Sequence, residues 1–542
     1  MTRDTAPHAP LAERGVHAVR GHLVLAALAD GRWWTARDLV RATAVAHRVV
    51  VETLAAVDPE LDRDGDRVRL RDPARYAPLT DLPRLADPVG HLLAAHADTE
   101  TELRRLVAEA PPPRADLDHV SATARTALRR ALFLTTRFTM DGARLLCVGD
   151  HDLTSLALTL LCPDAEAIVV DIDERMLGYI DAAAARLGRK VRCHFADLRI
   201  GLPPAVHASA DLVFTDPPYT PEGVELFVRR GLEGAADPRS TRVLLAYGAS
   251  ETTPALTARV QERLVRLHLA VEAIWPDFNR YLGAEAIGAA SDLYVLRATT
   301  RTPVGGRKAP STARIYSQGT NARESTESIT ARSAPSVWAD ADPDVFVGDW
   351  PREALPEGAR RVPLATWLSA PVTARCAAVN LTGGAEALTE RVILAAAAGN
   401  LRVVVGSHAA QVRDEAGRDA LRRVVGPHRP LEFRHAVPDP RHTVIRVGAA
   451  PEPHDTADTA AWLAHRLRER AHGSVASVLR EGLVQAAARS GRPVNKKWAR
   501  TNVAAALPWL SGHTLLDLPL HRFGELDAAL RRLAEALPRS GG

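Results

Sequence analysis

The chain has 542 residues, of which 46% are hydrophobic and 25% are charged, and its formal net charge is +4. This length is typical of about three domains with several cores, and the mild basic excess permits contact with nucleic acid without requiring it. The four cysteines form no Cys-x-x-Cys pair, so we expect neither a disulfide framework nor a metal site. No apolar run approaches about 18 residues and the N-terminus lacks a signal-peptide pattern, which favours a cytoplasmic protein without a membrane partner.

Residues 1–85 have the pattern of a winged-helix domain. Helical periodicity is found over 16–28, from residue 33 and over 46–55, and strand alternation follows over 61–70. Thr35 is placed to cap the second helix. Winged helices often bind DNA, but the third helix has few basic residues beyond His47 and Arg48. We therefore favour a packing or dimerisation role, which leaves a homodimer open and makes nucleic acid the less favoured partner.

The next region, 86–300, begins with Arg-rich helices over 89–108 and 121–135, whose charged faces are typical of solvated surface. Four apolar segments follow, each of which ends in an acid, as strands of an α/β sheet do at a ligand site. The first three lead to the turn Gly149-Asp150, to Asp171 and Asp173, and to Asp197. Asp171 lies about 20 residues past the turn, the spacing at which a strand-end carboxylate reaches a ribose hydroxyl. The pattern predicts a nucleoside-type cofactor site, with Asp197 near an adenine amine.

The turn after the first of these strands is not glycine-rich, and it carries Asp150 and Asp152. A pyrophosphate site needs backbone amides that approach an anion, whereas two carboxylates repel phosphate and attract cations. NAD and FAD are therefore poor candidates. Decarboxylated S-adenosylmethionine keeps a sulfonium and an ammonium but has lost its carboxylate, so an acid-lined pocket favours it as the cofactor.

Asp216-Pro217-Pro218-Tyr219 follows the fourth apolar segment, 212–215. Prolines fix φ and remove N–H donors, so we expect a stiff loop. An acid and an aromatic ring at a strand end can accept hydrogen bonds from an amine and stack beside it. This arrangement suits a reaction in which an amino nitrogen attacks a sulfonium carbon, although Pro and Asp are also common in plain surface turns.

Three of these segments together resemble the branched-chain polyamine synthases, which are N(4)-bis(aminopropyl)spermidine synthases. They are 149–155, 171–175 and 215–220, and the segments 277–281 and 292–297 add to the resemblance. It extends over roughly residues 15 to 300. The sequence departs from the family at His151, where Asp or Asn is expected, and in its long C-terminal extension.

The resemblance implies transfer of an aminopropyl group from decarboxylated S-adenosylmethionine to the secondary amine of spermidine or a related polyamine, with methylthioadenosine as the leaving product. Asp216 would hold the attacking nitrogen and take its proton, and Tyr219 would flank that amine by a cation–π contact. Asp150, Asp152 and Asp216 would offset the repulsion between two cationic substrates.

Further contacts to the acceptor are expected from Pro217 in the same loop, from Glu222 and from a second wall that contains Asn279 and Tyr281. Glu222 and Glu225 could bind a distal amine, although acids are also common in the first turn of a helix. Asn279 and Tyr281 offer neutral polar contacts, and the alternative for them is a plain transition from strand to loop.

Two other functions stay open on the sequence alone. An amino-methyltransferase that acts on a nucleic-acid base with intact S-adenosylmethionine also fits Asp-Pro-Pro-Tyr and a winged helix, but the acid-lined turn disfavours a phosphate backbone. A non-catalytic, DNA-binding regulator that senses polyamines is the second alternative, and the intact acids argue against lost catalysis.

The expected fold class is α/β, with a Rossmann-like sheet of the class I methyltransferase type, an N-terminal winged helix and a C-terminal α/β plus helical extension. The predicted parts are 1–85, 86–300, a flexible linker over 301–337, an α/β domain over 338–450 and a helical region over 451–542. The linker is inferred from its many Ser, Thr, Gly, Arg and Pro residues. The pattern of strands and helices over 377–407 repeats that of 211–248, so we interpret 338–450 as a degenerate half of the same fold.

Overall fold

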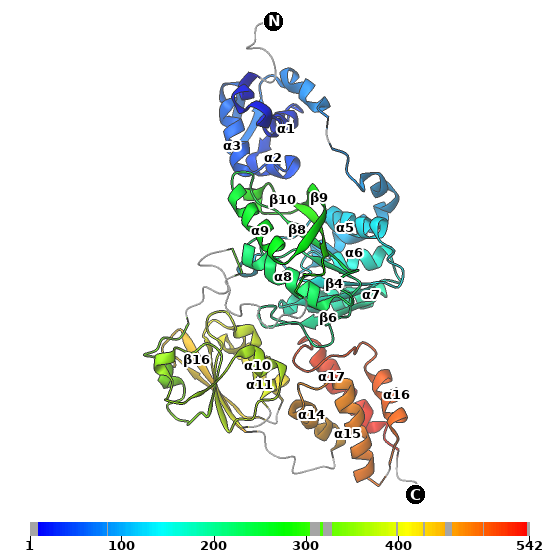
Figure 1. Cartoon of the computed structure of the whole chain (residues 1–542), viewed down its shortest axis with the longest axis vertical. Helices are drawn as coiled ribbons and strands as arrows, with labels where there is room; N and C mark the ends of the chain where they lie inside the picture. Colours follow the sequence, from blue (N-terminus) through cyan, green and yellow to red (C-terminus); the bar gives the residue numbers. More distant parts are fainter. Residues whose placement is uncertain are drawn as a thin grey trace. The chain divides into compact units, whose positions relative to one another are not determined.

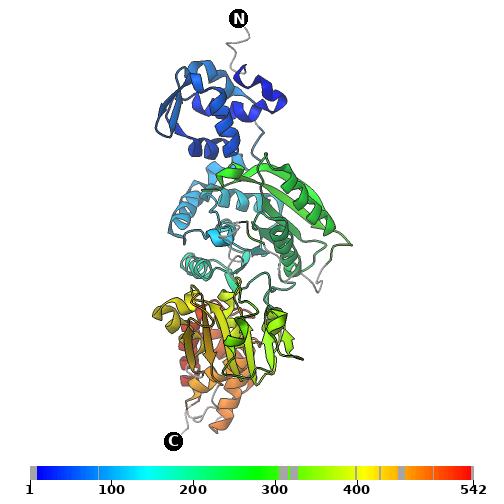
Figure 2. The ribbon, with the colours of Figure 1, turned by 90° about the vertical axis from the view of Figure 1, so that its left-hand side faces the viewer.

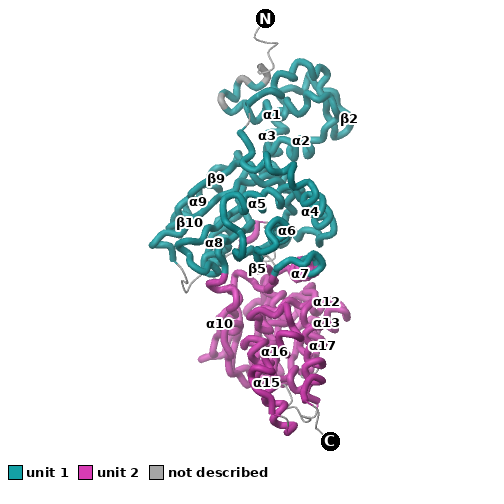
Figure 3. The backbone as a smooth tube through the Cα atoms, turned by 90° about the vertical axis from the view of Figure 1, so that its right-hand side faces the viewer, with its two compact units in different colours: residues 1–167, 183–191, 210–306 teal, residues 168–182, 192–209, 307–542 magenta. Residues whose placement is uncertain are grey.

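The computed structural model describes residues 9–83, 85–303, 315–317, 328–396, 399–426, 429–449, 458–491 and 493–538. The chain forms two compact units, which Figure 3 shows in different colours. The first contains residues 1–167, 183–191 and 210–306, and the second contains 168–182, 192–209 and 307–542. Within the described ranges, no helix is long and apolar enough to cross a membrane.

The first unit begins with three α-helices and a small antiparallel sheet of order β1-β3-β2. This part is the blue ribbon next to the N-terminus in Figure 2. The elements are α1 (Ala18–Leu28), β1 (Trp34–Thr35), α2 (Ala36–Thr43), α3 (His47–Ala56), β2 (Leu61–Asp64) and β3 (Arg67–Leu70). Thr35 caps α2, because its hydroxyl accepts the N–H of Asp38 at 3.1 Å. Gly65 turns β2 into β3 with a φ of 59°, a conformation that favours glycine.

The main sheet has seven strands in the order β6-β5-β4-β7-β8-β10-β9. Its strands are β4 (Arg144–Val148), β5 (Glu166–Asp171), β6 (Val191–Phe195), β7 (Leu212–Thr215), β8 (Arg242–Tyr247), β9 (Leu269–Arg280) and β10 (Ala290–Ala298). Figure 1 labels β4, β6, β8, β9 and β10 of this sheet. β4, β7 and β8 are parallel, and β10 lies antiparallel to both β8 and β9. The strand order reverses between β4 and β7, which is where such sheets bind ligands. The prediction of a Rossmann-like α/β fold is confirmed.

Two helices come directly before this sheet in the chain, and a helix follows each of β4, β5, β7 and β8, as crossovers between parallel strands require. They are α4 (Ala97–Glu109), α5 (Ala124–Arg137), α6 (Thr154–Leu161), α7 (Glu174–Leu187), α8 (Pro221–Gly234) and α9 (Pro254–Arg266). Every residue of β7 is buried, so this strand is apolar throughout rather than alternating.

The second unit contains a six-stranded sheet of order β12-β11-β13-β14-β16-β15. Its strands are β11 (Val345–Val347), β12 (Arg360–Val362), β13 (Cys376–Asn380), β14 (Asn400–Gly406), β15 (Leu431–His435) and β16 (His442–Val447). β12, β11, β13 and β14 are parallel, and β16 is antiparallel to β14 and to β15. The two larger sheets share this pattern. In each, parallel strands are followed by two antiparallel strands, and the later of these two in the chain (β10 or β16) lies next to the parallel strands.

Helices complete the second unit. They are α10 (Leu364–Ser369), α11 (Thr389–Ala395), α12 (Ala410–Arg413), α13 (Glu415–Val425), α14 (Thr459–Glu469), α15 (Val475–Arg489), α16 (Lys496–Ala506) and α17 (Arg522–Glu535). The last four share one apolar core, which includes Leu479, Leu483 and Leu530.

The segment 301–337, predicted to be a flexible linker, lies partly outside the described residues. Its described C-terminal part, 328–337, packs into the core of the second unit: Ile329 and Val337 are buried beside Trp338. The N–H of Ile329 also donates to the hydroxyl of Thr382 at 3.1 Å. The described end of that segment therefore belongs to the core of the second unit.

Candidate active site

The loops after β4 and β7 leave the sheet side by side. Val148 and Thr215, the last residues of these strands, are partners in the parallel ladder. The hydroxyl of Thr215 donates to the carbonyl oxygen of Val148 at 2.9 Å, which fixes the two strand ends. The turn that begins at Gly149 and the loop that begins at Asp216 therefore start from the same edge, as the strand pattern predicts.

Arg130 of α5 connects these two loops, and sequence reasoning missed it. Its side chain has no exposed surface. Its Nη1 donates to Oδ2 of Asp152 at 2.9 Å, and its Nη2 donates to Oδ2 of Asp216 at 2.6 Å. The guanidinium also lies over the ring of Phe214, 4.7 Å from its centroid. The Arg-rich face of this helix was expected to be solvated, and for Arg130 that expectation is wrong because the carboxylates of Asp152 and Asp216 hold it inside.

Periodicity offered a signal for Arg130. Ala127 and Leu134, three residues before it and four after it, are buried on the same face of α5. An arginine on the apolar face of a helix needs an acidic partner, and the strand-end carboxylates were the available ones.

Asp216 accepts three hydrogen bonds. Besides Arg130, the hydroxyl of Tyr219 donates to its Oδ1 at 2.9 Å and the hydroxyl of Tyr281 donates to its Oδ2 at 2.7 Å. The two tyrosine oxygens are themselves 2.9 Å apart, and the Tyr281 oxygen is 2.7 Å from Oγ of Ser291. The Asp216 side chain keeps 16% of its surface exposed. Asp216 thus lies in a polar network at the rim and not in the apolar interior.

Asn279 belongs to the same network, through Arg130. Its Oδ1 accepts from Nε of Arg130 at 2.8 Å, and its Nδ2 donates to Oγ of Ser291 at 3.0 Å. Asn279 is fully buried. It therefore orients the guanidinium in this structure, whereas the sequence predicted a contact with the acceptor.

The two carboxylates of this network, Asp152 and Asp216, have pKa values that are shifted in opposite directions. Burial alone would raise the pKa of Asp152, but the charges of Arg130 and His151 and the hydrogen bonds that Asp152 accepts together outweigh burial and hold that pKa below its ordinary value. Burial raises the pKa of Asp216 to about 7, with the Arg130 charge opposing and the Asp152 charge adding to the rise. Burial and the Asp216 charge also raise the pKa values of Tyr219 and Tyr281, so both donate as neutral phenols.

The turn after β4 is built around Asp150. Gly149 has a φ of 73°, which a side chain would strain. Oδ1 of Asp150 accepts the N–H of Thr154 at 2.8 Å and Oδ2 accepts that of Ser155 at 3.1 Å, so Asp150 holds the first turn of α6. Burial raises the pKa of Asp150 to about 7.

His151, the residue that departs from the family pattern, lies against two other side chains. Its Nε2 is 3.0 Å from Oγ of Ser121, and its ring stacks on His119 with centroids 4.5 Å apart. Its proximity also lowers the pKa of Asp152. A histidine here therefore reduces the negative field of the turn.

Asp171, Asp173 and Asp197 belong to the second compact unit. Asp171 ends β5 and accepts the N–H of Asp173 at 2.9 Å. Asp173 accepts from the guanidinium of Arg175, with a nearest approach of 2.6 Å, and Asp197 accepts in the same way from Arg199, also at 2.6 Å. Two of the three predicted cofactor carboxylates thus have an arginine two residues further along the chain.

The remaining predicted contacts lie near Asp216 in the sequence. Pro217 is buried. Glu222, in the first turn of α8, pairs with Arg263 of α9 at 2.9 Å, and Glu225 pairs with the same arginine at 3.1 Å. Because both glutamates already pair with Arg263, the structure favours the alternative that they are ordinary acids in the first turns of a helix, and not a site for a distal amine of the acceptor.

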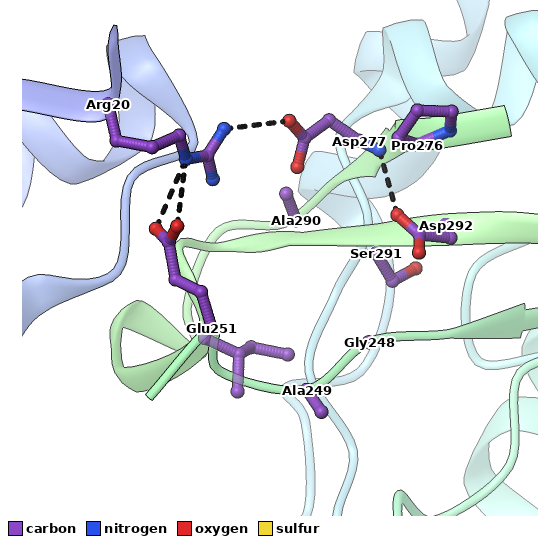
Figure 4. A pocket seen from close by; sticks show the side chains of 10 residues that line it. Arg20, Gly248, Ala249, Glu251, Pro276, Asp277, Ala290, Ser291 and Asp292 are labelled. Atoms are coloured by element: carbon purple, nitrogen blue, oxygen red, sulfur yellow. Dashed lines mark hydrogen bonds and ion pairs between the residues drawn. The ribbon is translucent and has the colours of Figure 1, made fainter. Parts of the chain in front are cut away.

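A pocket of about 260 Å³ adjoins the network through Ser291, which lines it. Figure 4 shows how Arg20 of α1 bridges Glu251 at 3.1 Å and Asp277 at 3.2 Å across this pocket. Oδ1 of Asp292 accepts the N–H of Asp277 at 2.9 Å. Three carboxylates and one guanidinium leave the pocket with an excess of negative charge, which suits a cation. Arg20 and Glu251 were not anticipated, since they are far from the motifs in sequence.

Residues 98–318 match the family model of the branched-chain polyamine synthase A C-terminal domain. Over 171 residues the chain is 35% identical to an uncharacterised protein of Methanocaldococcus jannaschii, which covers 32% of this chain and 43% of that protein. Over 197 residues it is 27% identical to the N(4)-bis(aminopropyl)spermidine synthase of the same organism. That match covers 36% of this chain and 55% of that protein. The chain thus spans about half the length of these curated relatives.

Among solved structures, the chain aligns with the branched-chain polyamine synthase from Thermus thermophilus in complex with N4-aminopropylspermidine and 5'-methylthioadenosine. The TM-score is 0.42 at 20% identity, and the alignment covers 59% of this chain and 98% of that one.

Proposed function

Because residues 98–318 belong to the branched-chain polyamine synthase family, we propose that this chain is an aminopropyltransferase. It moves an aminopropyl group from decarboxylated S-adenosylmethionine to the secondary amine of spermidine or a related polyamine. The observation that carries the proposal is Asp216, a strand-end carboxylate with its pKa raised to about 7 and three donors around it. Such a group can take a proton from an amine near neutral pH.

In the proposed reaction the acceptor nitrogen must first lose its proton, since an ammonium has no lone pair. Asp216 takes that proton, and the free amine attacks the methylene carbon next to sulfur. The bond from that carbon to sulfur breaks, its electron pair stays on sulfur, and methylthioadenosine leaves. Arg130 and the two tyrosines hold the Asp216 carboxylate in one orientation, which contributes by positioning.

The negative pocket of Glu251, Asp277 and Asp292 supports binding of a cationic acceptor. We propose that one ammonium of the polyamine lies there, where opposite charges at contact distance are worth about 1 to 4 kcal/mol depending on the remaining water. The pocket borders Ser291, and Ser291 contacts Tyr281. An amine in the pocket therefore places the next part of the polyamine near Asp216.

For the donor, we propose contacts from Gly149, Asp150 and Asp152 at the first turn and from Asp171, Asp173 and Asp197 at the following strand ends. The carboxylates would bind the ribose hydroxyls, the adenine amine and the donor's own charges. Asp173 already pairs with Arg175, and Asp197 with Arg199. To contact either carboxylate, the donor must share it with that arginine or displace the arginine.

The other parts of the chain carry further proposals. The three helices and the antiparallel sheet of the N-terminal module support a winged helix that serves for packing or for a homodimer, with nucleic acid the less favoured partner. The common strand pattern of the two larger sheets supports a degenerate copy over 338–450. A cytoplasmic enzyme remains our proposal for the whole chain.

One experiment separates this activity from its alternatives. The purified chain is incubated with spermidine and either decarboxylated or intact S-adenosylmethionine, with and without DNA or RNA, and the products are identified by mass spectrometry. A polyamine heavier by one or two aminopropyl groups is expected. A methylated base instead supports an amino-methyltransferase, and tight spermidine binding without any product supports a polyamine sensor; either result overturns the proposal.

A further inference from the structure

A second cavity, of about 330 Å³, lies within the second unit. Four parts of that unit form its wall: the end of β6 with the loop after it, the region of α10 and α11, His472 between α14 and α15, and the chain just before α17. Much of the wall is apolar, with contributions from Ile200, Leu202, Leu368, Leu388 and Leu516. Binding sites for small molecules begin at about this size and usually combine apolar walls with a few polar groups.

Arg391 supplies an unusual polar group to this wall. Its side chain is 1% exposed, and one face of its guanidinium lies 4.3 Å from the ring centroid of Phe195. Nη2 donates to Oε1 of Glu174 at 2.5 Å and to the carbonyl oxygen of Leu518 at 2.8 Å. Nε and Nη1 are buried and have no hydrogen-bond partner in the part of the chain that the structure describes. A buried donor without a partner is costly, especially on a charged group, so an occupant that accepts from Arg391 would stabilise it.

The acids of the same wall already have partners. Oδ1 of Asp517 is 3.1 Å from Nδ1 of His194, and its Oδ2 accepts from both the N–H and the hydroxyl of Thr514. Asp197 accepts from Arg199. His207, Ser369 and His472 also line this wall, but among its described side chains Arg391 is the one with buried polar atoms that have no hydrogen-bond partner.

A metal ion is not the occupant that these contacts favour. His194, His513 and Asp517 bring their ligand atoms within 4.8 Å of one another. However, Nδ1 of His513 accepts the N–H of Ser511 at 3.2 Å, and its Nε2 lies 3.1 Å from the carbonyl oxygen of Cys193. Both ring nitrogens are engaged in hydrogen bonds, so this histidine is fixed as a structural group.

We propose that this cavity binds a small monocarboxylic acid with an apolar body, whose carboxylate accepts hydrogen bonds from Arg391. Guanidinium and carboxylate groups match in charge and in planar geometry. The apolar walls exclude water from the rest of the ligand. Asp197 and Asp517 in the same wall repel ligands of higher negative charge, so phosphates and nucleotides are disfavoured.

This cavity shares Asp197 and the loop after β6 with the region that matches the family, and Asp197 is also a proposed contact to the aminopropyl donor. The residues that would bind the acid, Arg391 together with Ala365, Leu388 and Leu516, lie outside residues 98–318. Binding of an acid here needs neither the aminopropyl donor nor the polyamine, and its test can succeed or fail whatever the chain catalyses.

The test is titration calorimetry on the full chain near pH 7, with benzoate and hexanoate as acidic probes and with benzamide and inorganic phosphate as comparisons. Arg391→Met removes the donors and keeps an unbranched apolar chain. Ala365→Phe fills the cavity from α10 and leaves Arg391 in place, so it tests the site even if Arg391→Met does not fold. Ala420→Phe adds the same ring at an exposed position of α13 and is the matched control.

We expect at least one of the two acids to bind, at least tenfold more tightly than benzamide or phosphate. We expect both cavity variants to weaken that binding at least tenfold and Ala420→Phe to leave it unchanged. Absence of binding by either acid at millimolar concentration overturns the proposal, as does equal binding by benzamide or undiminished binding by the Ala365→Phe chain.

Discussion

Arg130 and Asp216 form a buried ion pair in which Nη2 lies 2.6 Å from Oδ2, and the same guanidinium donates to Asp152 at 2.9 Å. One positive charge therefore serves two carboxylates that come from two different strand ends. Because the Arg130 side chain is wholly buried, the pair holds the two loops in a fixed relationship.

Replacement of Arg130 is expected to damage both folding and turnover. Arg130→Met leaves the buried carboxylate of Asp152 and the partly buried one of Asp216 without their cation, and removal of one partner of a buried pair costs about 3–5 kcal/mol. Chemical denaturation should show a loss of that size, and turnover should fall at least tenfold. Arg125→Met on the same helix, where the side chain is 61% exposed, should change neither. An Arg130→Met chain as stable as the parent would contradict the burial of this pair.

Asp216→Asn should abolish most turnover and leave the fold intact. The amide cannot take the proton of the acceptor amine, so we expect a loss of about 10²–10⁴-fold in kcat. Asp141→Asn, at an exposed position before β4, is the control and should have full activity. Rapid-quench assays with both substrates measure the effect. Turnover within twofold of the parent would remove Asp216 from the chemistry.

The pH dependence of turnover should follow Asp216. Only the ionised carboxylate accepts a proton, and its pKa is raised to about 7, so kcat/KM should rise with pH through about 7. The Tyr281 hydroxyl stabilises the ionised form by donating to it. Tyr281→Phe should therefore move the midpoint to higher pH. A midpoint that moves to lower pH, or a profile that is flat between pH 5 and 8, would contradict this assignment.

The same raised pKa values affect stability with the opposite sign. Asp150 and Asp216 have folded-state pKa values of about 7 against an ordinary value of 3.8. Their contribution to the free energy of unfolding is therefore complete below about pH 4 and is lost as the pH rises through 7. Denaturation at several pH values should show that Asp216→Asn, which does not titrate, reduces the decline of stability between pH 4 and 7.

The negative pocket should determine the affinity for the polyamine. Glu251→Gln removes one of its three carboxylates and leaves Arg20 with Asp277, so we expect KM for spermidine to rise about tenfold, which corresponds to about 1.4 kcal/mol, with a smaller change in kcat. Glu262→Gln on α9, where the side chain is 56% exposed, is the matched control. Steady-state kinetics measures the effect, and an unchanged KM would move the acceptor away from this pocket.

Much of the site could be predicted from local patterns. Apolar segments that end in acids place Asp150, Asp152, Asp171 and Asp216 at or just after strand ends, because a buried strand has to be apolar and its loop can be polar. The α/β sheet itself follows the same logic. Arg130 was not predicted, since its role depends on partners that lie 22 and 86 residues away along the chain.

The sequence by itself determined the α/β architecture, the strand-end acids and the resemblance to a family, because these depend on short-range periodicity and on motifs of a few residues. Only the tertiary structure decided which charges meet: Arg130 with Asp152 and Asp216, Arg20 with Glu251 and Asp277, Glu222 with Arg263 and Arg391 with Glu174. Ion pairs of this kind have no fixed spacing along the chain. They form where packing brings distant segments together and removes water from between them.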